Sequence, residues 1–267
     1  MKPFLKWAGN KFRVLNQILP HLPAGERLIE PFVGSGALFL NSGYAAYLLA
    51  DSNADLIALY QHLQQEGDDF IAYCRSFFTP ENNAAERYYA FRARFNAIAA
   101  SREKAALFLY LNRHGYNGLC RYNKKGGFNV PFGRYKRPYF PQQEMAAFHI
   151  KSQTAVFRHQ NFTRTMQTAV SRDIIYCDPP YVPLSATASF TSYGAAPFGM
   201  DEQAELAALA QATAERGIPV LISNHDTPVT RQLYADADTI YSFKVARLIS
   251  CDGGKRTAVN ELLAVFQ

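Results

Sequence analysis

The run Ile174-Ile175-Tyr176-Cys177-Asp178-Pro179-Pro180-Tyr181 constrains the fold more than any other stretch of the sequence. Its β-branched and aromatic beginning is typical of a buried parallel strand. Proline has no backbone N–H to give to a sheet, so the strand has to stop at Asp178. We therefore expect Asp178 at the carboxyl edge of an open α/β sheet, where such sheets bind ligands.

The two prolines leave this segment rich in hydrogen-bond acceptors. They fix φ and remove two donors, so the free groups are the Asp178 carboxylate and the carbonyls of Asp178 and Pro179. These acceptors suit an amino group with two N–H donors, and Tyr181 offers a face on which a planar ring can stack. The exocyclic amine of a nucleobase meets both demands. A Pro-Pro turn capped by Asp178, with Tyr181 as ordinary core, is the alternative for this motif alone.

A second strand-and-turn unit lies near the N-terminus. Arg27 to Glu30 is typical of a short strand, and Gly34-Ser35-Gly36 then opens an apolar helix. Glycines permit close approach of a ligand to the backbone, although a lone Gly-x-Gly is more often an ordinary turn. A further predicted strand ends at Asp51, the position of the ribose-binding acid in dinucleotide folds. Together, the turn and Asp51 indicate a cofactor that contains a nucleoside.

Helical spacing of apolar residues runs from Asn53 to about Arg113, which is too long for a simple βαβ crossover and indicates an inserted helical subdomain. The rest of the chain alternates between predicted strands and helices. We expect strands near 154–158, 218–223, 239–249 and 257–266, a helix over 201–216, and a mobile loop over 184–198.

The basic charge is concentrated in one stretch. The net charge is +6, and residues 104–143 carry eight Lys or Arg and no Asp or Glu, so the rest of the chain has a net charge of −2. Lys124-Lys125-Gly126-Gly127 predicts a hairpin turn within this stretch. Arg, Asn and Tyr interleave around it, as suits phosphate contact, base recognition and wedging into a base stack. A solvated basic face is the alternative.

Composition indicates a protein without membrane spans or a metal centre. No apolar run reaches spanning length, and the N-terminal residues lack the apolar core of a signal peptide. Four cysteines without Cys-x-x-Cys spacing fit a reducing compartment better than zinc or disulfides. We expect a cytoplasmic protein that associates with the nucleoid through DNA and is a monomer in solution.

With these features in this order, the chain resembles the Dam-type DNA adenine-N6 methyltransferases across nearly all its length. The matching segments are Phe4 to Lys11, Glu30 to Gly36, Leu111 to Asn123, Asn129 to Tyr135 and Asp178 to Tyr181. Two positions depart from the family pattern. Asn10 stands where relatives often have a second glycine, and Phe162 stands where relatives can carry Tyr.

The resemblance implies an α/β fold of the class I S-adenosylmethionine-dependent methyltransferase type, with a mostly parallel sheet and an antiparallel edge hairpin. It implies a catalytic core formed by residues 1–55 and 145–267. Residues 56–144 would be an inserted helical and hairpin subdomain that recognises DNA. The implied reaction transfers a methyl group from S-adenosyl-L-methionine to N6 of a flipped adenine in double-stranded DNA, within GATC.

The resemblance also assigns roles to individual residues. Asp178, Pro179 and Tyr181 would be catalytic. The cofactor would be surrounded by Trp7, Lys11, Phe32, Gly34, Asp51, Phe162 and Asp178. DNA would be contacted by Lys6, Tyr116, Asn117, Leu119, Arg121, Pro131, Arg134 and Tyr135, with Tyr116 and Asn117 filling the space that the adenine vacates.

Three alternatives remain open from the residues. The first is a non-catalytic DNA-binding protein, which Gly34, Asp51 and Asp178 disfavour. The second is a protein-glutamine methyltransferase, which would have little use for the basic stretch. The third is an RNA adenine methyltransferase.

His225 beside Asp226 suggests either acid–base work or the capping of a strand end, and Lys255 and Arg256 lie in a predicted turn within reach of phosphate.

Overall fold

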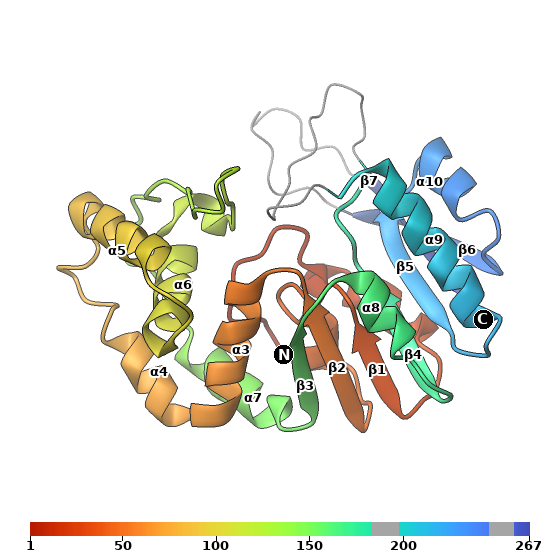
Figure 1. Cartoon of the computed structure of the whole chain (residues 1–267), viewed down its shortest axis with the longest axis horizontal. Helices are drawn as coiled ribbons and strands as arrows, with labels where there is room; N and C mark the ends of the chain where they lie inside the picture. The colour runs from red at the N-terminus through yellow and green to blue at the C-terminus, as the bar shows by residue number, and fades with distance from the viewer. Residues whose placement is uncertain (183–197, 246–258) are drawn as a thin grey trace.

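A seven-stranded sheet forms the centre of the computed structural model, which describes residues 1–182, 198–245 and 259–267 (Figure 1). The strands are β1 (Arg27–Glu30), β2 (Ala46–Asp51), β3 (Ala155–His159), β4 (Asp173–Cys177), β5 (Val220–His225), β6 (Thr239–Val245) and β7 (Val259–Phe266). Their spatial order is β3-β2-β1-β4-β5-β7-β6. β1 to β5 are parallel, whereas β7 is antiparallel to both β5 and β6, which confirms the predicted antiparallel edge.

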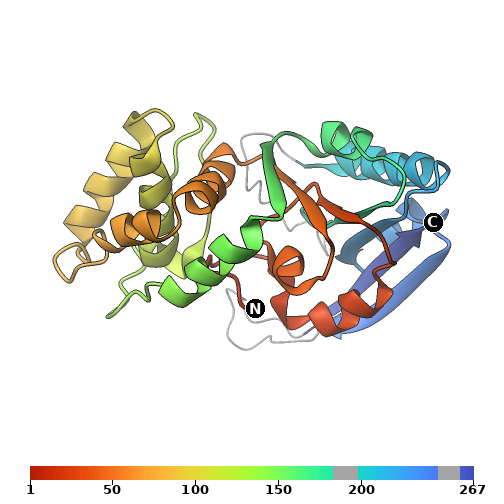
Figure 2. The same cartoon turned by 90° about the horizontal axis from the view of Figure 1, so that it is seen from below.

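Helices cover both faces of the sheet. The longer ones are α3 (Ala54–Glu66), α4 (Asp68–Arg75), α5 (Ala85–Ala97), α6 (Arg102–His114), α7 (Gln142–Ser152) and α9 (Met200–Ala214). The shorter ones are α1 (Leu15–Ile18), α2 (Ala37–Asn41), α8 (Phe162–Gln167), α10 (Pro228–Leu233), η1 (Lys11–Arg13), η2 (Leu19–His21) and η3 (Tyr116–Gly118). Figure 2 shows α8 and α9 on one face and the N-terminal helices on the other.

Alternation along the central strands divides the core between these two faces. Leu28 and Ile174 belong to a large aromatic cluster on one face, whereas Ile29 and Ile175 belong to a second cluster that includes residues of α8 and α9. Successive side chains of a strand point to opposite faces, so a sheet covered on both faces requires apolar residues at consecutive positions. The residues before Asp178 are therefore continuously apolar because both faces of their strand are covered.

Helices α3 to α7 occupy the long connection between β2 and β3, and α4, α5 and α6 lie to one side of the sheet (Figure 1). α3 also packs against β2 and β3, so the connection is continuous with the sheet. Its aromatic residues are mostly core: Phe70, Tyr88 and Phe95 are almost fully buried. The division of the chain at residues 55 and 145 stays a prediction.

The predicted hairpin around Lys124 is confirmed, in a short form. Tyr122 pairs with Phe128 in an antiparallel bridge, and the N–H groups of Asn123 and Asn129 donate to the carbonyls of Gly127 and Arg121 at 2.9 and 3.0 Å. The Asn123 side chain also stabilises the turn, since its oxygen accepts from the N–H groups of Lys125 and Gly127. One strand boundary needs correction: β5 runs to His225 rather than Ser223, because its pairing with β7 continues to Glu261. The predicted loop 184–198 lies almost wholly outside the described residues, as do Lys255 and Arg256.

Candidate active site

Asp178 and the Gly34 turn follow two neighbouring strands, β4 and β1. The chain leaves β1 towards β2 and β3 on one side and returns to β4 on the other, so the strand order reverses between β1 and β4. At such a reversal the connections diverge, and the carboxyl ends of the two strands border a ligand-binding crevice. Chain topology therefore brings together two motifs that are 144 residues apart in sequence.

The Asp178 carboxylate accepts a charge-assisted contact from Lys11, whose Nζ lies 2.8 Å from Oδ1. The same ammonium donates to the Gly9 carbonyl at 2.8 Å and lies 4.4 Å from the centre of the Tyr181 ring. The Lys11 ammonium, a group with several N–H donors, thus lies between the Asp178 carboxylate and the face of the Tyr181 ring. The sequence predicts that these two residues can receive such a donor group. Burial raises the pKa of Asp178 to about 6, and Lys11 opposes this shift.

Side chains from three other elements hold the loop after Asp178. Gln203 of α9 donates to the Pro180 carbonyl at 2.7 Å, and the Val182 N–H donates to Asn224 of β5 at 3.1 Å. The Tyr181 hydroxyl donates to Glu261 of β7 at 2.9 Å. The sequence singled out Asn224 only as part of the polar strand end Asn224-His225-Asp226, and it did not indicate Gln203 or Glu261, which lie in ordinary helix and strand patterns.

The Gly34 turn packs directly under Trp7. A Cβ at Gly34, where φ is +46°, would lie 2.8 Å from Trp7 Nε1, so only glycine allows this approach. The Gly34 N–H donates to Asp51 Oδ2 at 3.1 Å, and the Asn53 N–H donates to Asp51 Oδ1 at 2.9 Å. Burial raises the pKa of Asp51 to about 6. Trp7, Gly34 and Asp51 therefore form one group of predicted site residues.

Phe32 and Phe162 form a second group. Their rings stack with centroids 5.5 Å apart, and Phe198 lies edge-on to each at 5.5 and 5.6 Å. Phe198 was not among the predicted site residues, because it ends the stretch 184–198, which has no clear periodicity. The three rings offer an apolar surface next to the carboxyl end of β1, of a kind that suits a planar heterocycle.

Glu30 is a buried acid at the end of β1 that the sequence did not single out. Its side chain is 3% exposed, and its Oε1 has no hydrogen-bond partner. Burial raises its pKa to about 8, and the nearby Asp178 adds to this shift. A buried acceptor without a partner is costly unless a ligand supplies a donor. A ligand that donates a hydrogen bond to Oε1 would supply the missing partner, and a cationic donor would also lower this pKa.

The predicted DNA-contacting residues gather around Lys6. The Lys6 ammonium lies 4.1 Å from the centre of the Tyr135 ring, and the Tyr135 hydroxyl accepts from the Asn117 N–H at 2.9 Å. Asn112 of α6 fixes the Lys6 backbone by accepting from its N–H at 3.0 Å and donating to its carbonyl at 2.7 Å. Lys6 and Lys11 belong to one N-terminal segment, which links this cluster to Asp178.

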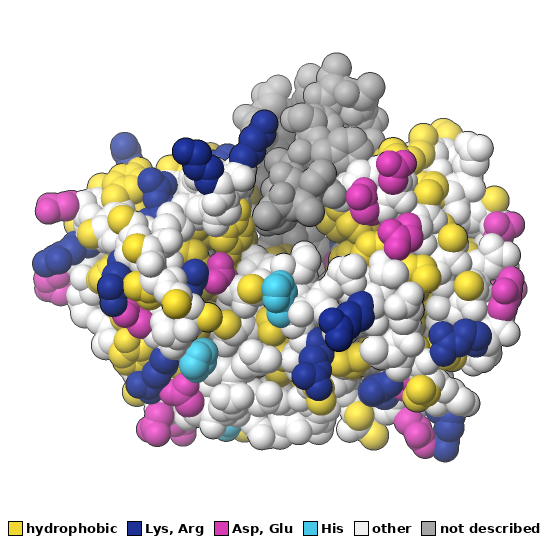
Figure 3. Space-filling view, in the orientation of Figure 1, with side chains coloured by type: hydrophobic (Ala, Val, Ile, Leu, Met, Phe, Trp, Pro, Cys, Tyr) yellow, Lys and Arg dark blue, Asp and Glu magenta, His cyan; other side chains and the backbone are white. Residues whose placement is uncertain are grey.

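The remaining DNA-contacting candidates lie along the same loop region. Tyr116 is 51% exposed, and its N–H donates to the Pro131 carbonyl at 2.9 Å. The Arg121 guanidinium donates from Nε to the Asn129 side-chain oxygen at 2.8 Å, which orients it. Leu119 packs partly against the core, and Arg134 is exposed with φ of +54°. Figure 3 shows basic side chains above this region and acidic ones near the start of α9.

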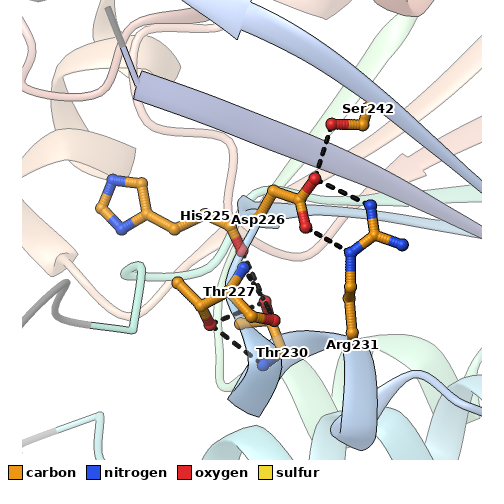
Figure 4. Close-up of polar contacts among 6 residues, drawn as sticks. All are labelled: His225, Asp226, Thr227, Thr230, Arg231 and Ser242. Carbon is orange, nitrogen blue, oxygen red and sulfur yellow. Dashed lines mark hydrogen bonds and ion pairs between the residues drawn. The ribbon is translucent and has the colours of Figure 1, made fainter. Parts of the chain in front are cut away.

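His225 and Asp226 point to opposite sides of the chain (Figure 4). The Asp226 carboxylate accepts from Arg231 at 2.6 and 2.9 Å and from Ser242 at 2.5 Å, and Thr227 caps the N-terminus of α10. His225 Nδ1 lies 2.8 Å from the Val182 carbonyl. Of the two predicted alternatives, the structural role therefore holds for Asp226.

Within residues 1–182, 198–245 and 259–267, no three His, Cys, Asp or Glu side chains are grouped as a metal site would require. No helix in this part of the chain combines the length and apolarity needed to cross a membrane.

The mostly parallel sheet with an antiparallel edge has the architecture of a class I α/β methyltransferase, and the Asp-Pro-Pro-Tyr loop and the glycine turn lie at its switch point. Residues 7–249 match the model of the D12 class of N6 adenine-specific DNA methyltransferases. The chain belongs to this family and is an adenine-specific DNA methyltransferase.

Full-length relatives support the assignment. The chain is 52% identical over 266 residues to a DNA adenine methylase of Escherichia coli K12, with 100% of this chain and 95% of the relative covered. It is 51% identical to a DNA adenine methylase of Serratia marcescens over 267 residues, with 100% and 98% covered. A DNA adenine methylase of Vibrio cholerae is 52% identical, with 99% and 96% covered.

Proposed function

We propose that this chain transfers a methyl group from S-adenosyl-L-methionine to N6 of an adenine everted from duplex DNA, within the sequence GATC. The observation that carries the proposal is the Asp178 acceptor, which already holds the Lys11 ammonium against the Tyr181 ring. An adenine amino group presents the same kind of N–H donors on a planar ring.

The residues near Glu30 fit the proposed cofactor. When bound, S-adenosyl-L-methionine supplies an activated methyl group on a positively charged sulfur. The unpartnered Glu30 oxygen suits its cationic amino acid part, Asp51 has lone pairs left for ribose hydroxyls, and Phe32 with Phe162 offers rings for adenine. The Trp7 ring packs against the backbone of Gly34, where the lack of a side chain allows this close contact.

Asp178 and Pro179 would activate the target nitrogen. The lone pair of the adenine amino group is delocalised into the ring, so the nitrogen is a poor nucleophile. Hydrogen bonds from both of its N–H groups to the Asp178 carboxylate and the Pro179 carbonyl draw the nitrogen towards a tetrahedral shape. A carboxylate has about four acceptor positions, so Asp178 can keep Lys11 and still accept the amine. Correct orientation of the lone pair then supplies much of the rate.

The target base has to leave the duplex, because this geometry is out of reach inside a base stack. Stacking on Tyr181 offsets part of the lost pairing energy, and Tyr116 with Asn117 fills the gap in the duplex. Lys6, Leu119, Arg121, Pro131 and Tyr135 read neighbouring base pairs, and Arg134 adds a further DNA contact. Lys6 and Tyr135 act as a unit in this role, since the ammonium lies over the ring.

Expression in a host without adenine methylation tests the function. Host DNA should become resistant to a nuclease that cuts only unmethylated GATC and sensitive to one that cuts only the methylated sequence. Asp178→Ala should abolish transfer while leaving the binding of DNA and cofactor largely intact. Retained turnover in Asp178→Ala would exclude the role of this carboxylate. Methylation of structured RNA or of a protein glutamine, with none of duplex DNA, would contradict the proposed substrate.

A further inference from the structure

Three polar side chains are buried together behind the Asp178 loop: Gln203 of α9, Asn224 of β5 and Tyr234 directly after α10, each 0% exposed. They satisfy one another. The Asn224 amide donates to Gln203 Oε1 at 3.1 Å and to the Tyr234 hydroxyl at 3.0 Å, and the Tyr234 hydroxyl donates to Gln203 Oε1 at 3.3 Å. Burying polar groups costs free energy that apolar residues of similar size would not cost at this position. The presence of the polar cluster therefore indicates a role other than filling the core.

Gln203 and Asn224 also bind the catalytic loop. Gln203 Nε2 donates to the Pro180 carbonyl at 2.7 Å, and Asn224 Oδ1 accepts from the Val182 N–H at 3.1 Å as well as from the neighbouring His225 N–H at 2.9 Å. These two contacts lie on either side of Tyr181 in the sequence. Pro179 and Pro180 have no N–H groups, so the sheet cannot anchor this segment through backbone donors. Side chains from the adjoining helix and strand take over that task.

We propose that Gln203 and Asn224 are positioning residues for methyl transfer, an inference that rests on the proposed function. By fixing the peptide groups at Pro180 and Val182, they set the direction of the Pro179 carbonyl and the plane of the Tyr181 ring. The Tyr181 hydroxyl has its own anchor at Glu261, so the ring is restrained at both ends. A displacement of about 1 Å in such a site is enough to reduce turnover about 100-fold.

Two variants remove the loop contacts with little change of volume. Gln203→Met deletes the donor to Pro180, and Asn224→Leu deletes the acceptor for Val182. We expect the single-turnover rate of methyl transfer to duplex DNA containing GATC to fall about 100-fold in each variant. KM for DNA and for S-adenosyl-L-methionine should stay close to wild type, because the groups that bind them are unchanged.

Ser223→Ala is the matched control. Ser223 precedes Asn224 on β5, is also 0% exposed, and its hydroxyl hydrogen-bonds to Tyr176 at 2.8 Å. The variant therefore loses a buried hydrogen bond on the same strand without touching Pro180 or Val182. Unfolding experiments should show that it is destabilised like the test variants, while its transfer rate stays near wild type.

The outcomes separate positioning from general stability. A transfer rate in Gln203→Met equal to that of wild type, or reduced no more than in Ser223→Ala, would overturn the proposal. If Gln203→Met fails to fold, Gln203→Asn replaces it, because it keeps an amide in the core but is one methylene too short to reach Pro180. Wild-type protein that leaves duplex GATC unmethylated would refute the proposed function. Active wild type with active variants would refute only the positioning role.

Discussion

The side-chain nitrogen of Lys11 lies 2.8 Å from Asp178 Oδ1. Lys11 is 5% exposed, and its ammonium also donates to the Gly9 carbonyl, in a turn where φ of Gly9 is +74°. A nearly buried cation beside a carboxylate with a raised pKa of about 6 keeps that carboxylate ionised further into the acid range than burial alone would allow. The N-terminal segment thus sets the charge of the proposed acceptor.

The pH dependence of turnover should reflect this pair. Asp178 accepts hydrogen bonds as a carboxylate, so the rate of transfer should rise with pH through about 6, its raised pKa. Lys11→Met removes the positive charge that lowers this pKa, and the rise should move to higher pH. Turnover measured at saturating DNA and cofactor between pH 5 and pH 9 tests this expectation. An unshifted profile would show that Asp178 does not control the rate.

The buried acid Glu30 should make the ligand-free protein less stable at alkaline pH. Its pKa is about 8 when folded, against 4.5 for the free side chain, so the folded state keeps a proton that the unfolded chain has lost in this interval. The contribution of Glu30 to the free energy of unfolding therefore falls as the pH rises from about 4.5 to 8. Glu30→Gln should show a flatter dependence between pH 6 and pH 8 in urea unfolding. Parallel curves for the two proteins would argue against a buried, protonated Glu30.

Gly34→Ala should weaken cofactor binding by displacing Trp7. The new Cβ would meet Trp7 Nε1 at 2.8 Å, and the positive φ adds about 1–2 kcal/mol of strain. Gly217→Ala is a matched control, since φ there is +77° and nothing lies within 4 Å of the added Cβ. Both variants should lose stability, but only Gly34→Ala should raise the Kd for S-adenosyl-L-methionine in calorimetry. Equal affinities would remove Trp7 and Gly34 from the cofactor site.

Arg121 should determine sequence preference, whereas Lys124 should add only general affinity. Asn129 orients the Arg121 guanidinium, as recognition of a guanine requires, while Lys124 lies exposed in the turn. Arg121→Ala should lose about 1–3 kcal/mol of discrimination at one base pair. Lys124→Ala should weaken binding to all sequences alike and reduce its salt dependence. Competition assays with base-substituted duplexes distinguish these two effects. If Arg121→Ala lost the same affinity for every sequence, Arg121 would be a phosphate contact.

Much of the fold followed from local signals. Prolines 179 and 180 end β4 after Cys177, and the apolar runs before Asp51 and Asp178 form strands buried on both faces. The hairpin around Lys124 was predicted correctly, because the glycines that permit its turn are a local signal, and backbone hydrogen bonds across the turn join its two sides. The strand boundary at Ser223 was wrong because pairing with β7 is a long-range event.

Sequence alone determined the chemistry of the chain: an acceptor-rich Asp-Pro-Pro-Tyr segment, a glycine turn, a strand-end acid and a basic stretch, since each depends on residue type and near neighbours. Only the tertiary structure decided which distant groups meet. Lys11 reaches Asp178, the orphaned Glu30 oxygen lies in the core, and Gln203 and Asn224 hold the loop. Such contacts are decided by strand order and packing, which place residues far apart in sequence within hydrogen-bonding distance.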